Sequence, residues 1–410
     1  MRMLTSWEDA SKRLEGLRVD VPATKEVVGP SVIGGRLAED IRAKVSNPPF
    51  RMSAMDGWAV PVCCLDKGET GLVIGTTVLA GMEAPGLAAG KTCAVMTGAP
   101  VPVEAGAVIP VEDARVEEGR LYWKDKLTEG QNIRAAAEDF AFGDVLLKAG
   151  TTIAPHHLLM LRAGGVGTVS ICGRIPVALI QTGDELCNGV ARKPGFSVYE
   201  STRACLLHWL RKLGGGRVAW SEVHDTQGGL RKALEDTLAE GQRLIVTTGG
   251  VSKGVADFVP AVAASLGGEV LLHRLAIKPS KPLLVVRFPN GAVLVGLPGN
   301  PVSQVLGLQA VVAPLLRCLQ PLKGMETHKA KLEDECGGRT GFRTFLRAVV
   351  RVSAEGRLVV RPLSGNESHR VSNLADCNAW IHVTGRHEAG SLVEVSPFVD
   401  THWNLAPCRP

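Results

Sequence analysis

The chain carries acidic residues and glycine-rich turns directly after short apolar runs that predict β-strands. The clearest example is TTGGVSKGVAD at residues 247–257, where a predicted strand ends in a glycine turn that opens a helix. Backbone N–H groups in such a turn point towards a bound anion, which makes Gly249, Gly250 and Ser252 candidates for binding a phosphate or another oxyanion. Asp257 adds a carboxylate beside the turn, and the combination suggests nucleotide-phosphate chemistry with a divalent metal ion.

Two lysines in the next motif, LAIKPSKP at residues 275–282, supply positive charge for the same chemistry. Lys278 and Lys281 flank rigid prolines, which restrict the directions in which the two ammonium groups can point. Arg274 directly precedes the motif. We therefore predict that this basic loop binds an oxyanion or a phosphate.

Other acids and one threonine occupy sharp turns elsewhere in the chain. They are Asp56 in SAMDGWA, Thr97 in MTGAPVP, Asp139 in GQNIRAAAED, Glu185 in QTGDEL and Asp225 in HDTQGG. Each acid also has an ordinary structural explanation, because aspartate and glutamate favour turns, helix caps and first helical turns. Taken singly, each acid leaves both interpretations open, but their joint occurrence beside two glycine-rich loops favours a functional site.

The elements that must position these residues change character along the chain. Residues 4–15 predict an amphipathic helix, with Thr5 as its N-cap and Glu8 closing a capping box. Short β-branched runs separated by Gly and Pro follow to about residue 150. From residue 175 strands alternate with helices, which predicts a parallel sheet covered by helices, and after residue 323 strands alone return.

These patterns predict a multi-domain protein with α/β and β parts. The chain has 410 residues, of which 45% are hydrophobic, and is long enough for two to four domains. We predict a three-layer α/β domain with a parallel-rich sheet at residues 1–26 and 175–325, and a linker domain at 27–45 and 143–174. An inserted β-rich domain at 46–142 and a C-terminal β-barrel-like domain at 326–410 complete the chain.

Composition argues against several classes of protein. The net charge is +5, but Lys and Arg are spread along the chain and only 4% of residues are aromatic, so a nucleic-acid binder is not indicated. Ten cysteines at irregular spacing, with Cys63 and Cys64 adjacent, match neither a zinc ribbon nor a secreted disulfide framework. No signal peptide is evident, and the longest predicted apolar helix, at 302–319, is interrupted by Gln309 and Pro314. We expect a cytoplasmic protein without a membrane segment.

Seven motifs together resemble one known family. NPPFRMSAMDGWA, VMTGAPVP, GQNIRAAAED, VALIQTGDEL, TTGGVSKGVAD, LAIKPSKP and VGLPGNPVS occur in the order and at the spacing of the molybdopterin molybdenumtransferases, which include the C-terminal domain of gephyrin. The resemblance extends from about residue 4 to residue 398. It implies the last step of molybdenum-cofactor assembly, in which adenylylated molybdopterin and molybdate give the molybdenum-loaded dithiolene and AMP.

The resemblance also implies roles for individual residues. The implied catalytic residues are Asp56, Thr97, Asp139, Glu185, Asp225, Asp257 and Lys278, and Glu185, Asp225 and Asp257 are the implied Mg²⁺ ligands. Those implied to bind the substrates or the oxyanion are Gly249, Gly250, Ser252, Arg274, Lys278, Lys281, Pro298, Gly299, Asn300, Arg347 and Ser368. Mg²⁺ is the implied cofactor, with molybdate and adenylylated molybdopterin as substrates.

The resemblance further implies an elongated homodimer. In the family, the residues that match Asp56 and Thr97 reach the active site across the dimer interface, so each site would use two subunits. An upstream molybdopterin adenylyltransferase and acceptor molybdoenzymes are candidate protein partners, and no nucleic acid is expected.

The chain departs from the family pattern at several positions. Arg274 stands where lysine is common, and Ser280 and Ala137 replace glycines, so we expect slightly different backbone angles there. Glu200 and Thr202 stand where aspartate and asparagine are typical.

Two alternatives to a molybdenum-inserting enzyme follow from the sequence. A non-catalytic scaffold of the same fold would tolerate loss of the motif acids, whereas all of them are present. A homologue that inserts tungstate is not distinguished, because the two oxyanions have nearly the same size and charge.

Overall fold

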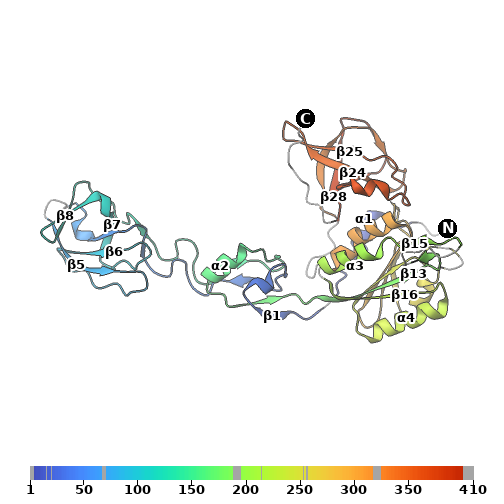
Figure 1. The fold of residues 1–410 in the computed structure, drawn as a ribbon, viewed down its shortest axis with the longest axis horizontal. Helices are drawn as coiled ribbons and strands as arrows, with labels where there is room; N and C mark the ends of the chain where they lie inside the picture. Colours follow the sequence, from blue (N-terminus) through green and yellow to red (C-terminus); the bar gives the residue numbers. More distant parts are fainter. Residues whose placement is uncertain are drawn as a thin grey trace. The chain divides into compact units, whose positions relative to one another are not determined.

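The structure is a computed structural model that describes residues 4–14, 16–19, 21–66, 71–187, 195–213, 215–252, 254, 257–316 and 325–399. The chain divides into two compact units (Figure 1). Unit 1 consists of Met1–Pro22 and Gly173–Pro410, and unit 2 of Ala23–Cys172. The finer domain boundaries given above stay predictions. Within the described ranges, no helix is both long enough and apolar enough to cross a membrane.

Unit 1 contains the predicted α/β domain, built on a six-stranded sheet with the order β16-β13-β17-β21-β20-β18. The strands are β13 (Ile175–Thr182), β16 (Gly215–Val223), β17 (Leu244–Thr248), β18 (Glu269–His273), β20 (Leu284–Arg287) and β21 (Val293–Leu297). The first four strands in this order run parallel, and β20 and β18 pair antiparallel with their neighbours. The predicted parallel-rich sheet is therefore confirmed.

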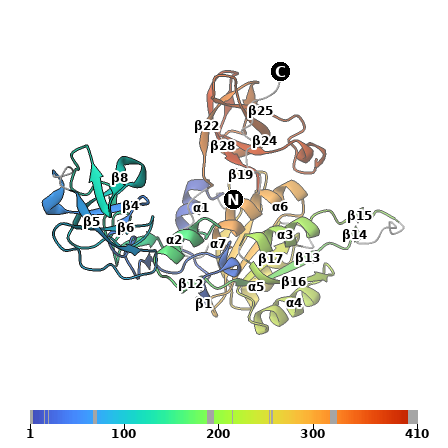
Figure 2. The ribbon, with the colours of Figure 1, turned by 60° about the vertical axis from the view of Figure 1, so that its left-hand side comes forward.

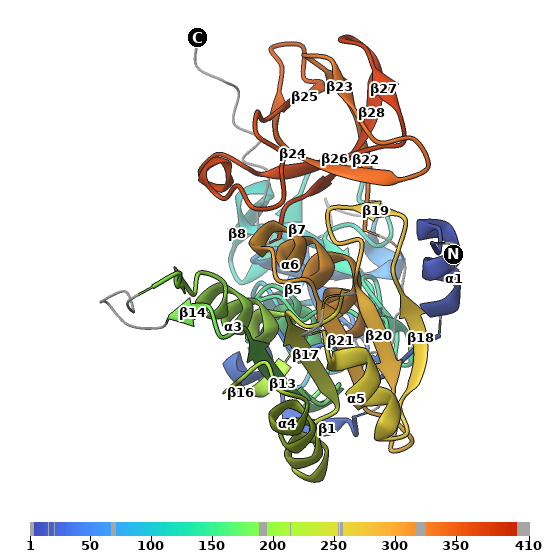
Figure 3. The same ribbon diagram turned by 90° about the vertical axis from the view of Figure 1, so that its right-hand side faces the viewer.

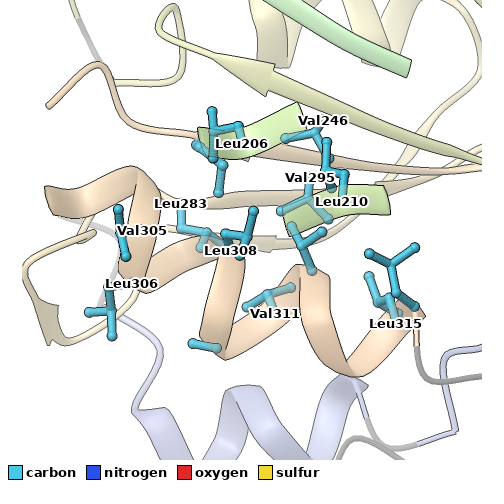
Figure 4. Close-up of a cluster of buried hydrophobic side chains, with 14 of the residues drawn as sticks. Leu206, Leu210, Val246, Leu283, Val295, Val305, Leu306, Leu308, Val311 and Leu315 are labelled. Atoms are coloured by element: carbon cyan, nitrogen blue, oxygen red, sulfur yellow. The ribbon is translucent and has the colours of Figure 1, made fainter. Parts of the chain in front are cut away.

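Helices pack on both faces of this sheet (Figure 3). They are α3 (Arg203–Lys212), α4 (Gln227–Ala239), α5 (Val259–Ser265), α6 (Pro301–Gly307) and α7 (Ala313–Leu316). Val246 of β17 belongs to the same buried cluster as Leu206 of α3 (Figure 4), whereas its neighbour Ile245 belongs to a second cluster with Leu230 of α4 and Val262 of α5. Side chains alternate between the faces of a strand, so burial of both faces explains why the sheet strands are continuous apolar runs.

The longest predicted apolar helix is interrupted. Instead of one helix over residues 302–319, α6 is followed by a π-helical turn, Leu308–Val312, and then by α7, while residues 317–319 lie outside the described residues. Gln309 in this turn accepts a hydrogen bond from Trp380 Nε1 at 2.8 Å and donates one to the Pro397 carbonyl at 2.6 Å. The polar interruption in the sequence thus attaches this helical segment to the C-terminal domain.

The C-terminal part of unit 1 is a closed β-barrel (Figure 3). Its strands, in order around the barrel, are β24 (Arg343–Val352), β25 (Leu358–Pro362), β22 (His328–Leu332), β28 (Leu392–Pro397) and β26 (Ala379–Val383), and β26 pairs with β24 to close it. The short strand β19 (Ile277–Lys278), which precedes β20 in the chain, pairs with β24. Two further strands, β23 (Cys336–Gly337) and β27 (Arg386–His387), pair with each other. The predicted all-β C-terminal unit is confirmed.

The N-terminal helix begins later than predicted. α1 spans Trp7–Leu14, and its first turn is capped by Ser6, whose Oγ accepts a hydrogen bond from Asp9 N at 3.0 Å. The predicted cap, Thr5, lies instead in a β-bridge with Leu275, the first residue of the basic loop. Glu8, which was predicted to close a capping box, forms an ion pair with Arg343 of β24, with 3.2 Å between Oε1 and Nη1. The predicted cap was wrong because Thr5 and Glu8 make contacts with distant parts of the chain in place of the helix start.

Unit 2 contains the predicted inserted β-rich domain (Figure 2). Its sheet has the order β7-β4-β6-β5-β9-β8. The strands are β4 (Gly57–Pro61), β5 (Leu72–Val78), β6 (Lys91–Val95), β7 (Ala105–Pro110), β8 (Ala114–Glu117) and β9 (Arg120–Trp123). Paired short strands join the chain entering this domain to the chain leaving it: β1 (Thr24–Val27) with β12 (Thr168–Ile171), β2 (Ile41–Arg42) with β11 (Val145–Leu147), and β3 (Met52–Ser53) with β10 (Ile133–Arg134). The helix α2 (His157–Ala163) lies between β11 and β12 in the chain.

Two residues that replace family glycines have a left-handed backbone. The φ angle is 60° at Ala137 and 75° at Ser280, in the region that favours glycine. A non-glycine residue in this region costs roughly 1–2 kcal/mol. Ser280 gains an interaction in return, because its Oγ donates a hydrogen bond to the Ser303 carbonyl at 3.0 Å. Ala137 has only a methyl side chain, so its backbone cost has no such offset.

We therefore predict that Ala137→Gly stabilises the protein by about 0.5–1 kcal/mol, because relief of the left-handed strain exceeds the added chain entropy. Ala136→Gly is the matched control, because Ala136 is exposed and its φ is not positive. The control should lower the free energy of unfolding by a similar amount. Urea unfolding of both variants measures the two changes, and a loss of stability in Ala137→Gly would contradict this account.

Candidate active site

A pocket of about 500 Å³ opens at the carboxyl ends of the parallel strands in the α/β domain. Residues after β13, β16 and β17 line it, together with the first residues of α6. The predicted site residues that line it are Glu185, Asp225, Asp257, Gly249, Gly250, Gly299 and Asn300. This edge is where open α/β sheets bind their ligands, and the sequence placed these residues there.

Three predicted acids lie in this pocket, and their neighbours orient two of them. Asp225 Oδ2 accepts a hydrogen bond from Asp184 N at 3.2 Å, and Asp257 Oδ2 accepts one from Gly254 N. Glu185 is exposed to solvent in the pocket. These backbone bonds hold one oxygen of each aspartate, so the other oxygen of each carboxylate can accept a ligand's hydrogen or coordinate a cation.

The predicted metal ligands do not form a complete metal cage. Across the described residues, no three His, Cys, Asp or Glu side chains are close enough together to hold a metal ion. The oxygen donors of the pocket nevertheless suit Mg²⁺, which usually takes one or two protein carboxylates and completes its shell with substrate phosphates and water. The donor set therefore fits an ion that arrives with the substrate better than a resident ion.

The glycine turn after β17 approaches β13 very closely. Gly249 and Gly250 have φ of 83° and 64°, and a Cβ on Gly249 would lie 2.8 Å from Thr182 Oγ1. Only glycine fits this turn, which brings the backbone to the edge of the pocket. Ser252 follows on the surface. Pro298 is buried directly after β21.

Glu200 is a buried acid of the pocket to which the sequence assigned no role. Its side chain is 8% exposed, and its Oε1 accepts hydrogen bonds from Thr202 N, Arg203 N, Thr202 Oγ1 and Gln181 Nε2 at 2.6–3.1 Å. Burial raises the pKa of Glu200, but these hydrogen bonds outweigh burial and leave the pKa below its usual value. The pocket therefore holds a fourth carboxylate. The signal in the sequence was an acid just before a helix.

The basic loop is fixed by contacts with both domains of unit 1. Arg274, which has φ of 69°, donates its backbone N–H to the Leu283 carbonyl at 3.0 Å and closes the base of the loop. Lys278 lies in β19, which pairs with the barrel strand β24. Lys281 Nζ lies 5.8 Å from the centre of the Phe342 ring. Because Ser280 bonds to α6, the loop contacts the same helix whose N-terminus borders the pocket.

Ser368 lies at the first turn of the same helix. Its Oγ accepts a hydrogen bond from Asn300 Nδ2 at 3.1 Å, and its carbonyl accepts one from Val302 N at 3.4 Å. Asn300 precedes Pro301 at the helix start as predicted, but its side chain binds Ser368 in place of the helix backbone. Ser368 and the basic loop thus both contact α6.

Arg347 is fully buried, and its guanidinium holds the loop that carries Ser368. It donates to the carbonyls of Gly365 at 2.8 Å and Glu367 at 3.0 Å, and also to the Arg370 carbonyl. Burial lowers the pKa of Arg347, and the nearby Cys377 and Glu367 partly oppose that shift. In this geometry the guanidinium supports the loop that carries Ser368. The direct oxyanion contact that the resemblance implies stays a prediction.

Three predicted site residues belong to unit 2. Asp56 Oδ1 accepts hydrogen bonds from Thr97 N at 2.6 Å and Thr97 Oγ1 at 2.7 Å, and these bonds lower the pKa of Asp56. Asp139 is exposed and accepts a hydrogen bond from Asn47 Nδ2 at 3.0 Å. Asp56 and Thr97 therefore form a pair, while their participation in the pocket of unit 1 stays a prediction.

Three models of known protein domains together match most of the chain. The profile described as "MoeA N-terminal region (domain I and II)" matches residues 5–165, "Probable molybdopterin binding domain" matches 178–318, and "MoeA C-terminal region (domain IV)" matches 329–398. A molybdopterin molybdenumtransferase from Synechococcus elongatus is 32% identical over 409 residues, which cover 96% of this chain and 99% of the relative. The chain belongs to the molybdopterin molybdenumtransferase family. The resemblance carried by the seven motifs is confirmed.

Other relatives support the same assignment. A molybdopterin molybdenumtransferase from Haemophilus influenzae is 30% identical over 404 residues, 97% of this chain and 99% of the relative. A crystal structure of the molybdopterin biosynthesis MoeA protein from Pyrococcus horikoshii has a TM-score of 0.82 at 25% identity and covers 97% of this chain and 100% of its own. Because the curated relatives carry the name of the enzyme, the scaffold alternative is not favoured.

We predict that Glu200→Ala lowers the free energy of unfolding by about 2 kcal/mol, because the donors at the start of α3 and Gln181 lose their acceptor. Glu200→Gln is the matched control, since its amide oxygen can still accept these hydrogen bonds, and its loss should stay below about 1 kcal/mol. Urea unfolding distinguishes the two. Equal losses would mean that the hydrogen bonds to Oε1 do not hold this wall of the pocket.

Proposed function

We propose that this chain inserts molybdenum from molybdate into adenylylated molybdopterin and releases AMP. The observation that carries the proposal is a division of charge around α6. Of the described residues that line the pocket, Glu185, Glu200, Asp225 and Asp257 are acidic and none is Lys, Arg or His. The basic loop and the Ser368 loop contact the same helix from the barrel side.

The acidic pocket suits the part of the substrate that donates hydrogen bonds. A pterin ring carries amino and ring N–H groups, which carboxylates accept, whereas a pyrophosphate would be repelled by four carboxylates. The anionic groups, phosphate and molybdate, are better placed towards Lys278, Lys281 and Ser368. The proposal therefore assigns the two ends of the substrate to the two sides of α6.

The main task of Lys278 and Lys281 in the basic loop is to stabilise negative charge on the substrates. Negative charge develops on phosphate and molybdate oxygens as AMP leaves, and lysines fixed on a rigid loop stabilise that charge without rearranging. Ser368 can donate its hydroxyl hydrogen to the oxyanion, and Arg347 keeps the Ser368 loop in place.

Mg²⁺ dependence is the finer part of the proposal. Glu185, Asp225 and Asp257 are the residues that would hold the ion, because their oxygens line one pocket. When bound, Mg²⁺ would offset the mutual repulsion of these carboxylates, which no Lys, Arg or His among the described lining residues compensates.

A homodimer would complete each site. Asp56 and Thr97 form a hydrogen-bonded pair in unit 2, and the family resemblance implies that this pair serves the pocket of the other subunit. We propose this arrangement in a cytoplasmic enzyme, with an upstream adenylyltransferase and acceptor molybdoenzymes as its protein partners.

The direct test is AMP release by the pure protein from adenylylated molybdopterin with Mg²⁺ and molybdate. We predict that Asp257→Asn folds normally but loses about 10²-fold of this activity, because it keeps the side-chain shape and removes the charge. Asp236→Asn is the control, since Asp236 is exposed on α4 and outside the pocket. No AMP above a heat-inactivated sample would contradict the proposed function, and full activity in Asp257→Asn would contradict the role of that acid.

Subunit mixing tests the proposed dimeric site. Asp56→Asn and Lys278→Ala should each be nearly inactive, and mixing them after reversible dissociation should restore about a quarter of wild-type activity. The reason is that about half of randomly reassociated dimers are mixed, and each mixed dimer has one site without a lesion. Mass spectrometry confirms subunit exchange. Exchange without recovery would mean that each site is built within one chain.

A further inference from the structure

Cys63 and Cys64 form a pair of adjacent thiols that the proposed function does not use. They end the 3₁₀ turn Val62–Cys64, and their Sγ atoms lie 3.5 Å apart. Both thiols are reduced; Cys63 is exposed, and Cys64 is buried at 8% exposure. Neighbouring side chains in a helical turn normally diverge, so sulfur atoms in contact are an unusual arrangement.

Packing against β7 and the core of unit 2 fixes this turn. Val62 N donates to the Glu104 carbonyl at 3.0 Å, and a Cβ on Gly106 would lie 2.9 Å from Val62 Cα. Cys64 belongs to a buried cluster with Val60 and Leu121. One thiol is therefore held by the core while the other meets solvent, so a reagent can reach Cys63 first and find Cys64 beside it.

The separation of the sulfur atoms indicates what the pair can bind. A disulfide needs an S–S distance of about 2.05 Å, so the two sulfur atoms would have to move towards each other. A single thiophilic atom could bind both sulfur atoms without moving them. With bonds of about 2.3 Å to each sulfur, its S–X–S angle would be about 100°. That angle suits a pyramidal trivalent centre.

The described residues offer no third metal-binding side chain beside the two thiols, which limits the kinds of atom that the pair can bind. A structural zinc site needs four protein ligands, and the described residues offer no group of three metal-binding side chains. A monosubstituted trivalent arsenic atom needs only two thiolates, because its organic group occupies the third position.

We propose that Cys63 and Cys64 are a dithiol site for monosubstituted trivalent arsenicals of the arsenoxide class. Two As–S bonds form as the As=O bond breaks, and the oxygen leaves as water with both thiol hydrogens. Arsenic stays trivalent, so the step needs no oxidant or reductant. The proposal is independent of the proposed enzymatic function.

Phenylarsine oxide is the probe. One equivalent should give a single adduct with loss of one water, and the adduct should map to the tryptic peptide of residues 52–67, which contains these two cysteines and no other. A 1,2-dithiol should remove the arsenical, whereas a monothiol at the same thiol concentration should not.

Variants separate chelation from binding to single thiols. Cys63→Ser and Cys64→Ser should each raise the dissociation constant by at least about 100-fold, because a chelate becomes a single bond. Cys63 is exposed, so Cys63→Ser should fold even if the core substitution at Cys64 does not. An adduct outside residues 52–67, or unchanged affinity in Cys63→Ser, would overturn the proposal, as would the absence of any adduct in the wild type.

Discussion

The attachment of one loop to two domains is the constraint on which the candidate site depends. The basic loop closes on itself within the α/β domain, pairs with the barrel through β19, and bonds to α6 through Ser280. A lysine on a free loop would have to be ordered by its ligand, at a cost of up to about 2 kcal/mol in side-chain entropy plus the loop's own ordering. Here the backbone that carries Lys278 is already fixed by β-pairing. The left-handed backbone at Arg274 and Ser280 is a strain that the surrounding contacts maintain.

The helix α6 connects this loop to the rest of the site. Its first residues line the acidic pocket. Its Ser303 carbonyl accepts a hydrogen bond from Ser280 of the basic loop, and its N-cap Asn300 donates one to Ser368. Charge is therefore segregated: carboxylates lie at the strand ends, and lysines lie on the barrel side. Such segregation suits a substrate with a donor-rich ring at one end and phosphate at the other. The buried Arg347 supports this division, because it organises the Ser368 loop through backbone carbonyls.

The sequence predicted what local patterns determine and missed what distant contacts determine. Apolar runs and helix signals placed the parallel strands and their helices, so the acids at 185, 225 and 257 were expected at one edge of the sheet. Thr5 failed as a cap because it forms a bridge with Leu275, 270 positions away, which local propensity cannot register. Arg347 was named by the family resemblance alone, and its burial beneath the Ser368 loop depends on distant contacts that the sequence does not show. Glu200 received no role because its place in the pocket depends on a contact distant in the chain, the hydrogen bond from Gln181 Nε2 at the end of β13.

The measurement closest to the central claim is the location of molybdate in crystals of this protein, recorded at the molybdenum absorption edge. This account predicts an anomalous peak within hydrogen-bond distance of Lys278 Nζ and Ser368 Oγ, on the barrel side of α6. The carboxylates of Glu185, Asp225 and Asp257 should not contact it. A peak among those carboxylates, or a bound oxyanion that touches neither Lys278 nor Ser368, would contradict the assignment of the anionic groups to the basic loop.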